Sequence, residues 1–101
     1  MQTPEGKTKA AVKKLLTGYK CYQHWPVMNG MGAPTLDCIG CHNGKFFAVE
    51  CKAPGKKPTP RQEVTMSDMT LAGAEVFVCD GTVPDLLMLR TWLEDNKNVL
   101  R

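Results

Sequence analysis

The sequence predicts an α/β fold in which helices flank a four-stranded mixed sheet, with elements in the order α-β-β-β-α-β-α. Three observations support this prediction. Asn43-Gly44 separates two stretches rich in β-favouring residues, proline marks the start of three helical segments, and an apolar run at 75–79 follows the second of these segments. Because the chain has only 101 residues, we expect a single domain spanning 1–101.

Each helical segment carries its own end signals. The first begins at Thr3-Pro4-Glu5, which supplies a cap, a proline at the first helical position and an acid in the first turn, and it ends at Gly18. The second begins at Thr59-Pro60-Arg61-Gln62, which has capping-box spacing, and ends at Gly73. A final helix follows Pro84 and can use its apolar stripe to cover the sheet or to contact a second copy. The stripe comprises Leu86, Leu89, Trp92 and Leu93.

Asn43-Gly44 determines how the central strands pair. Both central positions of a type I′ turn need positive φ, which Asn and Gly tolerate. Residues 36–42 and 45–52 are therefore expected to form an antiparallel hairpin. A helix near 60–72 then connects strand 45–52 to strand 75–79, so those two strands should be parallel and joined by a right-handed crossover. The remaining strand is expected at 19–27, and the nearly continuous apolar run at 75–79 predicts a strand covered on both faces.

Charge is distributed unevenly along the chain. Residues 1–62 hold ten Lys and Arg against three acids, whereas residues 63–101 hold three against seven. The basic first part suggests a polyanionic partner, although lysines that simply solvate surface helices and loops explain the same count. The first residues lack the apolar segment of an export signal, and no apolar run approaches the length of a membrane span. We therefore expect an intracellular protein with no membrane partner.

The hairpin register brings two acids together. If Asn43-Gly44 forms the turn, facing residues have numbers that sum to 87, and Asp37 lies opposite Glu50. Directly opposed carboxylates repel each other unless a cation lies between them. Oxygen ligands at such spacing suit Mg²⁺ or Mn²⁺, and Lys52 on the same face can position a water molecule or a phosphate. This set predicts phosphodiester hydrolysis; the alternative is a surface ladder of Asp, Lys and Glu.

The cysteines suggest two other chemistries. Cys38-Ile39-Gly40-Cys41-His42 matches the spacing of a haem-attachment clip, and its two cysteines could begin a zinc site. Residues three apart in a strand lie on opposite faces, so these cysteines should not grip one metal, and haem attachment would need an exported, largely helical chain. Cys38, Cys51 and Cys79 are better explained as small core residues. The role of Cys21 stays open, and His24 and His42 are expected to be structural.

One ordered set of residues resembles a known family. It comprises Thr3-Pro4-Glu5-Gly6-Lys7, Asn29-Gly30, Gly32, Pro34, Asp37, Glu50-Cys51-Lys52-Ala53-Pro54 and Pro60-Arg61-Gln62. Over roughly residues 3–81 this set resembles the virus-type replication-repair nuclease (VRR-NUC) domain of the PD-(D/E)xK nuclease superfamily. The resemblance implies a restriction-endonuclease-like core and a VRR-NUC-like domain across the chain.

The resemblance also implies roles for individual residues. Asp37 and Glu50 would bind Mg²⁺ or Mn²⁺ together with the backbone carbonyl of Cys51. Lys52 would hold the attacking water or the scissile phosphate. Gln62 would be an additional active-site residue, although it also suits a capping box. Glu5 would be a metal ligand or would lie just behind the ligands, although it also suits the first turn of a helix.

The resemblance implies a metal-dependent, structure-specific endonuclease that cuts branched DNA such as four-way junctions. It also implies that the protein works as a homodimer, in the cytoplasm of a bacterium or of a phage-infected host. A catalytically inactive DNA-binding module of the same fold is the alternative. Phosphate contacts would come from the basic residues around the expected centre and along the first helix, with a further polar contact from the loop before the hairpin. These expected DNA-binding residues are Lys7, Lys13, Lys14, Asn29, Lys56, Lys57 and Arg61.

Overall fold

A computed structural model describes residues 2–27 and 32–97, and within them the predicted order α-β-β-β-α-β-α is confirmed. The helices are α1 (Pro4–Gly18), α2 (Pro60–Leu71) and α3 (Val83–Asp95). The strands are β1 (Tyr22–His24), β2 (Cys38–His42), β3 (Lys45–Cys51) and β4 (Glu75–Cys79), and they lie side by side in that order. The pairs β1–β2 and β2–β3 are antiparallel, whereas β3–β4 is parallel, which gives the mixed sheet that the sequence predicts.

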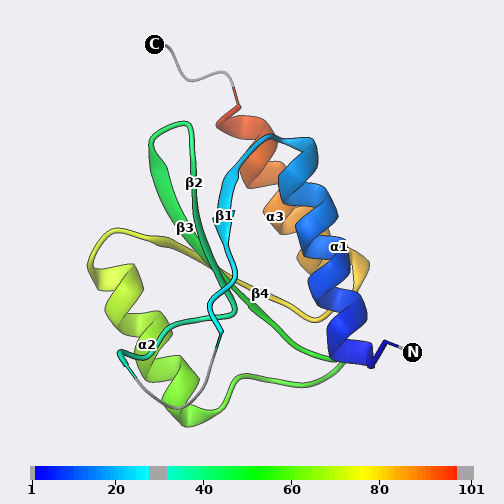
Figure 1. Cartoon of the computed structure of the whole chain (residues 1–101), viewed down its shortest axis with the longest axis vertical. Helices are drawn as coiled ribbons and strands as arrows, with labels where there is room; N and C mark the ends of the chain where they lie inside the picture. Colours follow the sequence, from blue (N-terminus) through cyan, green and yellow to red (C-terminus); the bar gives the residue numbers. More distant parts are fainter. Residues whose placement is uncertain (1, 28–31, 98–101) are drawn as a thin grey trace.

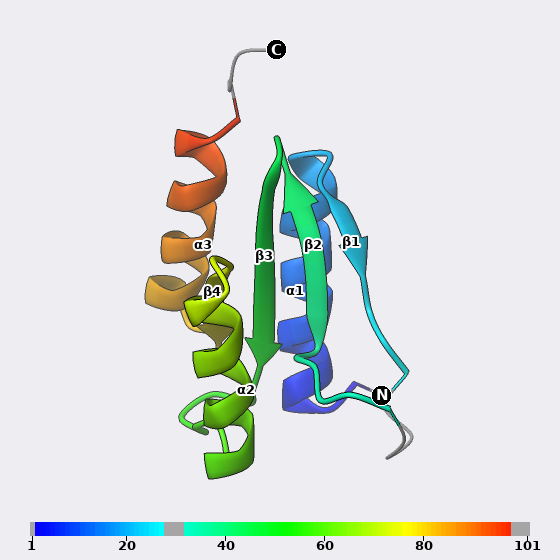
Figure 2. The same ribbon diagram turned by 90° about the vertical axis from the view of Figure 1, so that its left-hand side faces the viewer.

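Helices cover the two faces of the sheet unequally. Figures 1 and 2 show α1 and α3 together on one face and α2 on the other. The face toward α1 and α3 forms the main core, where Val12 and Leu16 of α1 and Leu89 and Leu93 of α3 are fully buried. Of the two uses expected for the α3 stripe, core packing is therefore the one observed for Leu89 and Leu93.

The hairpin turn has the predicted geometry. Asn43 and Gly44 have φ of 51° and 84°, as a type I′ turn requires. His42 pairs with Lys45 and Cys38 with Val49, so the predicted register is confirmed. Strand β2 starts at Cys38, two residues later than expected, and Asp37 lies in a bend just before it.

Two other strand predictions need correction. The strand expected at 19–27 is only Tyr22–His24, because Tyr19 caps α1 and Lys20 turns the chain with φ of 59°. Strand β4 contacts both α2 and α3 but lies at the edge of the sheet, so Cys79 is its only fully buried residue and the predicted complete cover is wrong. Within the described residues, no helix is long and apolar enough to cross a membrane.

Gly40 lets β1 and Phe47 approach β2 closely. A Cβ atom at this position would lie 2.2 Å from the carbonyl oxygen of Tyr22 and 2.6 Å from Cζ of Phe47. We expect Gly40→Ala to lower the free energy of unfolding by about 3 kcal/mol or more, because neither backbone nor a buried ring can yield cheaply. Urea unfolding measures the change.

Gly18→Ala is the matched control, because no atom lies within 4 Å of a Cβ placed at this helical position. It should stabilise the protein by up to about 1 kcal/mol, as alanine replaces glycine in a helix. If both variants change stability equally, the packing explanation for Gly40 is wrong.

Candidate metal and active centre

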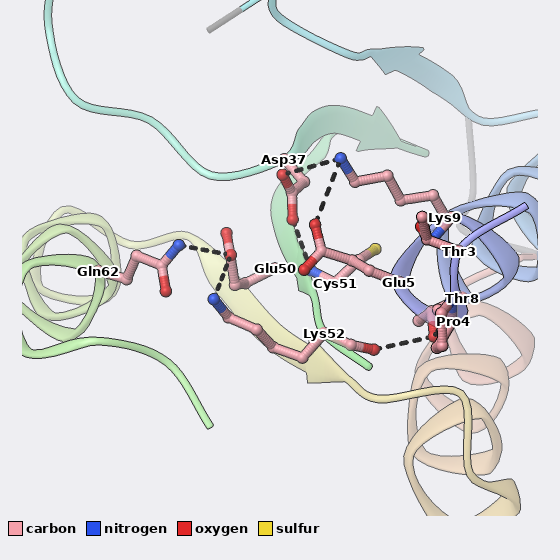
Figure 3. A network of polar contacts seen from close by, with 11 residues as sticks. Thr3, Pro4, Glu5, Thr8, Lys9, Asp37, Glu50, Cys51, Lys52 and Gln62 are labelled. Carbon is pink, nitrogen blue, oxygen red and sulfur yellow. Dashed lines mark hydrogen bonds and ion pairs between the residues drawn. The ribbon is translucent and has the colours of Figure 1, made fainter. Parts of the chain in front are cut away.

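Glu50 is a buried acid on the face of β3 opposite the main core. It is 2% exposed, although the strand bearing it ends one residue later. Its Oε2 accepts a hydrogen bond from Nε2 of Gln62 at 2.8 Å, and Nζ of Lys52 lies 3.5 Å from the same oxygen. Figure 3 shows these side chains converging on Glu50 from α2 and from the end of β3. Glu50 and Lys52 thus share a site, as the hairpin register predicts.

The surroundings of Glu50 disfavour its charged form. The pKa of Glu50 is raised from 4.5 to about 7, chiefly by burial and also by the nearby charge of Asp37, while Lys52 acts in the opposite direction. The two acids are therefore close enough to repel each other, as expected. A cation placed between them would relieve this repulsion.

Asp37 reaches this site from the bend before β2. Its Oδ2 accepts a hydrogen bond from the backbone N–H of Cys51 at 2.8 Å. The side chain therefore crosses to the end of β3 although Asp37 is outside the paired ladder, whose last pair is Cys38 with Val49. Asp37 is not a strand residue paired with Glu50, but it lies beside that residue by means of its own hydrogen bond.

Both backbone polar groups of Lys52 are hydrogen-bonded to other elements. Its N–H donates to the carbonyl of Cys79 at 2.8 Å, and its own carbonyl accepts from Oγ1 of Thr8 at 2.9 Å. Thr8 is 2% exposed and also donates to the carbonyl of Pro4. The contact of Thr8 with Lys52 could not be predicted from the sequence, because a single hydroxyl on a helix gives no signal of a partner 44 positions away.

Gln62 completes the predicted capping box and also contacts Glu50, while its role in an active site stays a prediction. Its backbone N–H donates to Oγ1 of Thr59 at 3.2 Å, and its Oε1 accepts from the N–H of Thr59 at 3.0 Å, which completes a capping box. Its Nε2 remains available and binds Glu50. The cap and the site contact therefore use different atoms of one amide.

Glu5 connects to the site through Lys9. Nζ of Lys9 lies 3.7 Å from Oε2 of Glu5 and 3.6 Å from Oδ1 of Asp37. Lys9 was not among the expected site residues. Its i,i+4 spacing from Glu5 could have predicted the contact with Glu5, but not the contact with Asp37. Whether Glu5 also binds a metal directly stays a prediction.

The donor set fits a hard divalent cation. Asp37 and Glu50 offer carboxylate oxygens of the kind that Mg²⁺ and Mn²⁺ prefer. The raised pKa of Glu50 indicates that nearby cations compensate its negative charge incompletely. Among the described residues, no three His, Cys, Asp or Glu side chains are grouped so that they could hold an ion. An ion at this site would therefore need further oxygens, such as the expected carbonyl of Cys51 and water molecules.

The described basic residues predicted to contact DNA are all exposed. They are Lys7, Lys13 and Lys14 on α1, Lys56 and Lys57 in the loop after β3, and Arg61 on α2. Nζ of Lys13 lies 5.1 Å from the ring centre of Trp25, which gives it a cation–π partner within the protein. Arg61 and Gln62 line a hollow of about 450 Å³ beside the site. Asn29 lies outside the described residues.

The cysteines and His42 have structural surroundings. Cys38 is buried and Cys41 exposed, so they lie on opposite faces as predicted, and burial raises the pKa of both Cys38 and Cys79 to about 12.

Nε2 of His42 lies 2.9 Å from the carbonyl oxygen of Leu93, so this nitrogen carries a hydrogen. The opposite nitrogen lies 3.4 Å from Sγ of Cys21, whose pKa burial raises to about 11. Cys21, left open by the sequence, is therefore a protonated thiol that can donate to His42.

Comparison with known proteins gives one informative match. The chain is 50% identical over 42 residues to a protein of Acyrthosiphon pisum secondary endosymbiont phage 1 named "Putative nuclease p44". The matched stretch covers 42% of this chain and 45% of the phage protein, so the chain spans less than half of that relative's length. No protein-family model matches the sequence. No solved structure matches it either.

The raised pKa of Glu50 predicts a specific pH dependence in the metal-free protein. Between pH 4.5 and about 7 the folded state keeps a proton on Glu50 that the unfolded chain has released. The free energy of unfolding should therefore fall as pH rises through this window. Urea unfolding in the presence of a chelator, at several pH values, measures the slope.

Glu50→Gln is the control, because the neutral amide removes this titration. The slope of the variant should be less negative than that of the wild type between pH 4.5 and 7. Identical slopes would show that Glu50 titrates normally in the folded protein.

Proposed function

We propose that this protein is a Mg²⁺- or Mn²⁺-dependent endonuclease that hydrolyses DNA phosphodiesters. The observation that carries the proposal is the buried Glu50 carboxylate, in contact with Lys52 and Gln62 and repelled by Asp37. A purely structural site would gain stability by replacing Glu50 with a neutral residue, since its burial is only partly compensated. The phage relative, whose printed name is that of a nuclease, supports the same class of activity.

The residues divide the work as follows. Asp37, Glu50 and the carbonyl of Cys51 would hold the ion, which when bound supplies an activated water and stabilises negative charge on the phosphate. Lys52, 13% exposed in its side chain, keeps an ammonium group beside Glu50, where it can orient the water or the phosphate. Gln62 fixes the rotamer of Glu50 through one hydrogen bond, so the carboxylate is oriented before substrate arrives.

The preferred substrate in this proposal is branched DNA such as a four-way junction, and the working form is a homodimer. Two symmetric centres suit the cutting of two strands at a symmetric junction. The resemblance to the VRR-NUC domain is the support for both statements. Light scattering of the purified protein, alone and with a junction, gives the number of copies.

A cleavage panel tests the catalytic proposal. Single-stranded, nicked, flapped and four-way DNA are incubated with the protein and Mg²⁺ or Mn²⁺. We expect the junction to be cut fastest, and Glu50→Gln and Lys52→Met to slow the cutting by about 100-fold or more. Arg90→Ala, an exposed change on α3, should cut at the wild-type rate.

Two results would count against the enzyme. The first is the absence of cutting on every DNA, and the second is equal cutting by the wild type and Glu50→Gln. Tight binding of a junction without cleavage would instead favour the inactive DNA-binding module.

Salt dependence tests the phosphate contacts separately. In the Glu50→Gln background, which should bind without cutting, replacing Lys56, Lys57 and Arg61 by alanine should weaken DNA binding. The slope of log K against log salt should become shallower by about 0.9 for each phosphate that the variant no longer neutralises. Fluorescence anisotropy measures both quantities, and Arg90→Ala is again the control. An unchanged slope in the triple variant would remove these residues from the interface.

A further inference from the structure

The ammonium group of Lys9 lies next to Oδ1 of Asp37, the carboxylate oxygen that does not bind β3. Oδ2 of Asp37 is held by the backbone N–H of Cys51, while Oδ1 is 3.6 Å from Nζ of Lys9. Oε2 of Glu5 lies 3.7 Å from the same ammonium group (Figure 3). The remaining oxygen of a proposed metal ligand is therefore next to a cation that belongs to the protein itself.

The contacts of Lys9 are longer than the hydrogen bonds of 2.8 Å that Asp37 and Glu50 accept from Cys51 and Gln62. Both of its distances exceed the 2.7–2.9 Å of a direct charge-assisted hydrogen bond. Its side chain is 40% exposed, whereas that of Lys52 is 13% exposed. Lys9 can consequently move its ammonium group into solvent at small cost, while Lys52 is enclosed.

The positive charge of Lys9 affects how readily Asp37 can bind a cation. Two acids, Glu5 and Asp37, share the ammonium group of Lys9. If Asp37 held a divalent ion, the ammonium group of Lys9 beside this carboxylate would repel the ion as a like charge, which opposes binding.

We propose that Lys9 is the counter-ion of Asp37 when no metal is bound, and that it competes with Mg²⁺ or Mn²⁺ for this carboxylate. This proposal rests on the metal site of the proposed function. Lys9 determines the concentration of free metal at which the site fills. Its ammonium group moves from Asp37 into solvent when the ion binds. The competition acts through charge, so any neutral residue at position 9 strengthens metal binding.

Binding of Mn²⁺ to the DNA-free protein tests the proposal without measuring activity. Isothermal titration calorimetry, with electron paramagnetic resonance of the unbound Mn²⁺ as a second readout, gives the dissociation constant. Lys9→Met should bind Mn²⁺ about fivefold more tightly than the wild type at low salt, the size expected for one partly exposed charge. The difference should shrink as salt is added.

Three variants make the result specific. Lys9→Arg keeps the positive charge and should bind Mn²⁺ like the wild type, and Lys9→Gln repeats the neutral change with a polar side chain should the methionine variant fold poorly. Arg90→Met removes a charge from an exposed position on α3 and should leave Mn²⁺ affinity unchanged. Circular dichroism confirms that each variant is folded.

The outcomes separate this proposal from the one on which it rests. If the wild type binds Mn²⁺ and the neutral variants bind it equally or more weakly, Lys9 is not a competitor, while the metal site stands. Tighter binding by Lys9→Arg as well would also overturn the proposal, because charge would not be the cause. If the wild type binds no Mn²⁺, both proposals fail.

Discussion

The burial of the Glu50 carboxylate is the constraint on which the candidate site depends. An acid that is 2% exposed is unfavourable unless it is hydrogen-bonded and paired with a cation. Gln62 and Lys52 provide these partners, yet burial still raises the pKa of Glu50 to about 7. The protein thus keeps an acid whose charge its own residues compensate incompletely, which is the electrostatic condition for attracting a cation.

The fold meets this constraint by bringing three elements to the end of β3. The crossover through α2 returns the chain as β4, parallel to β3, and places the start of α2 beside Glu50. Thr8 of α1 fastens the carbonyl of Lys52 from the opposite side of the sheet. Close packing continues at Gly81, where a Cβ would lie 2.7 Å from Oγ1 of Thr8. The centre is therefore positioned by regular elements, with one short bend supplying Asp37.

Local signals in the sequence were sufficient for the order of elements and for the register of the hairpin. Asn43-Gly44 admits one turn geometry, and that turn determines which residues of β2 and β3 face each other. The register predicts that Asp37 and Glu50 lie close together, but Asp37 lies outside the paired strands and its side chain reaches the site through a hydrogen bond from the N–H of Cys51. The end of α1 was harder to predict, because Tyr19 and Lys20 favour a strand by composition but serve as a cap and a turn.

Interactions between distant segments account for what could not be predicted from the sequence. Lys9 reaches Asp37 across 28 positions and Thr8 reaches Lys52 across 44, and neither residue belongs to a motif that would indicate its partner. Gln62 had two competing explanations from its sequence position, and the structure shows that they are compatible, because the amide oxygen completes the cap while the amide nitrogen binds Glu50. Sequence patterns thus identified the acids of the site better than the cations that balance them.

The charge balance links the lysines to the proposed chemistry. Glu5, Asp37 and Glu50 are three acids, and Lys9 and Lys52 are two cations, so the metal-free cluster has one negative charge in excess when all are ionised. Such a cluster repels a phosphodiester. In the proposed function, a bound divalent ion reverses the sign, and the site then attracts the phosphate while Lys52 stays enclosed beside it. Affinity for DNA at this centre would therefore depend on the metal, whereas the exposed lysines and Arg61 around it would hold DNA with or without the ion.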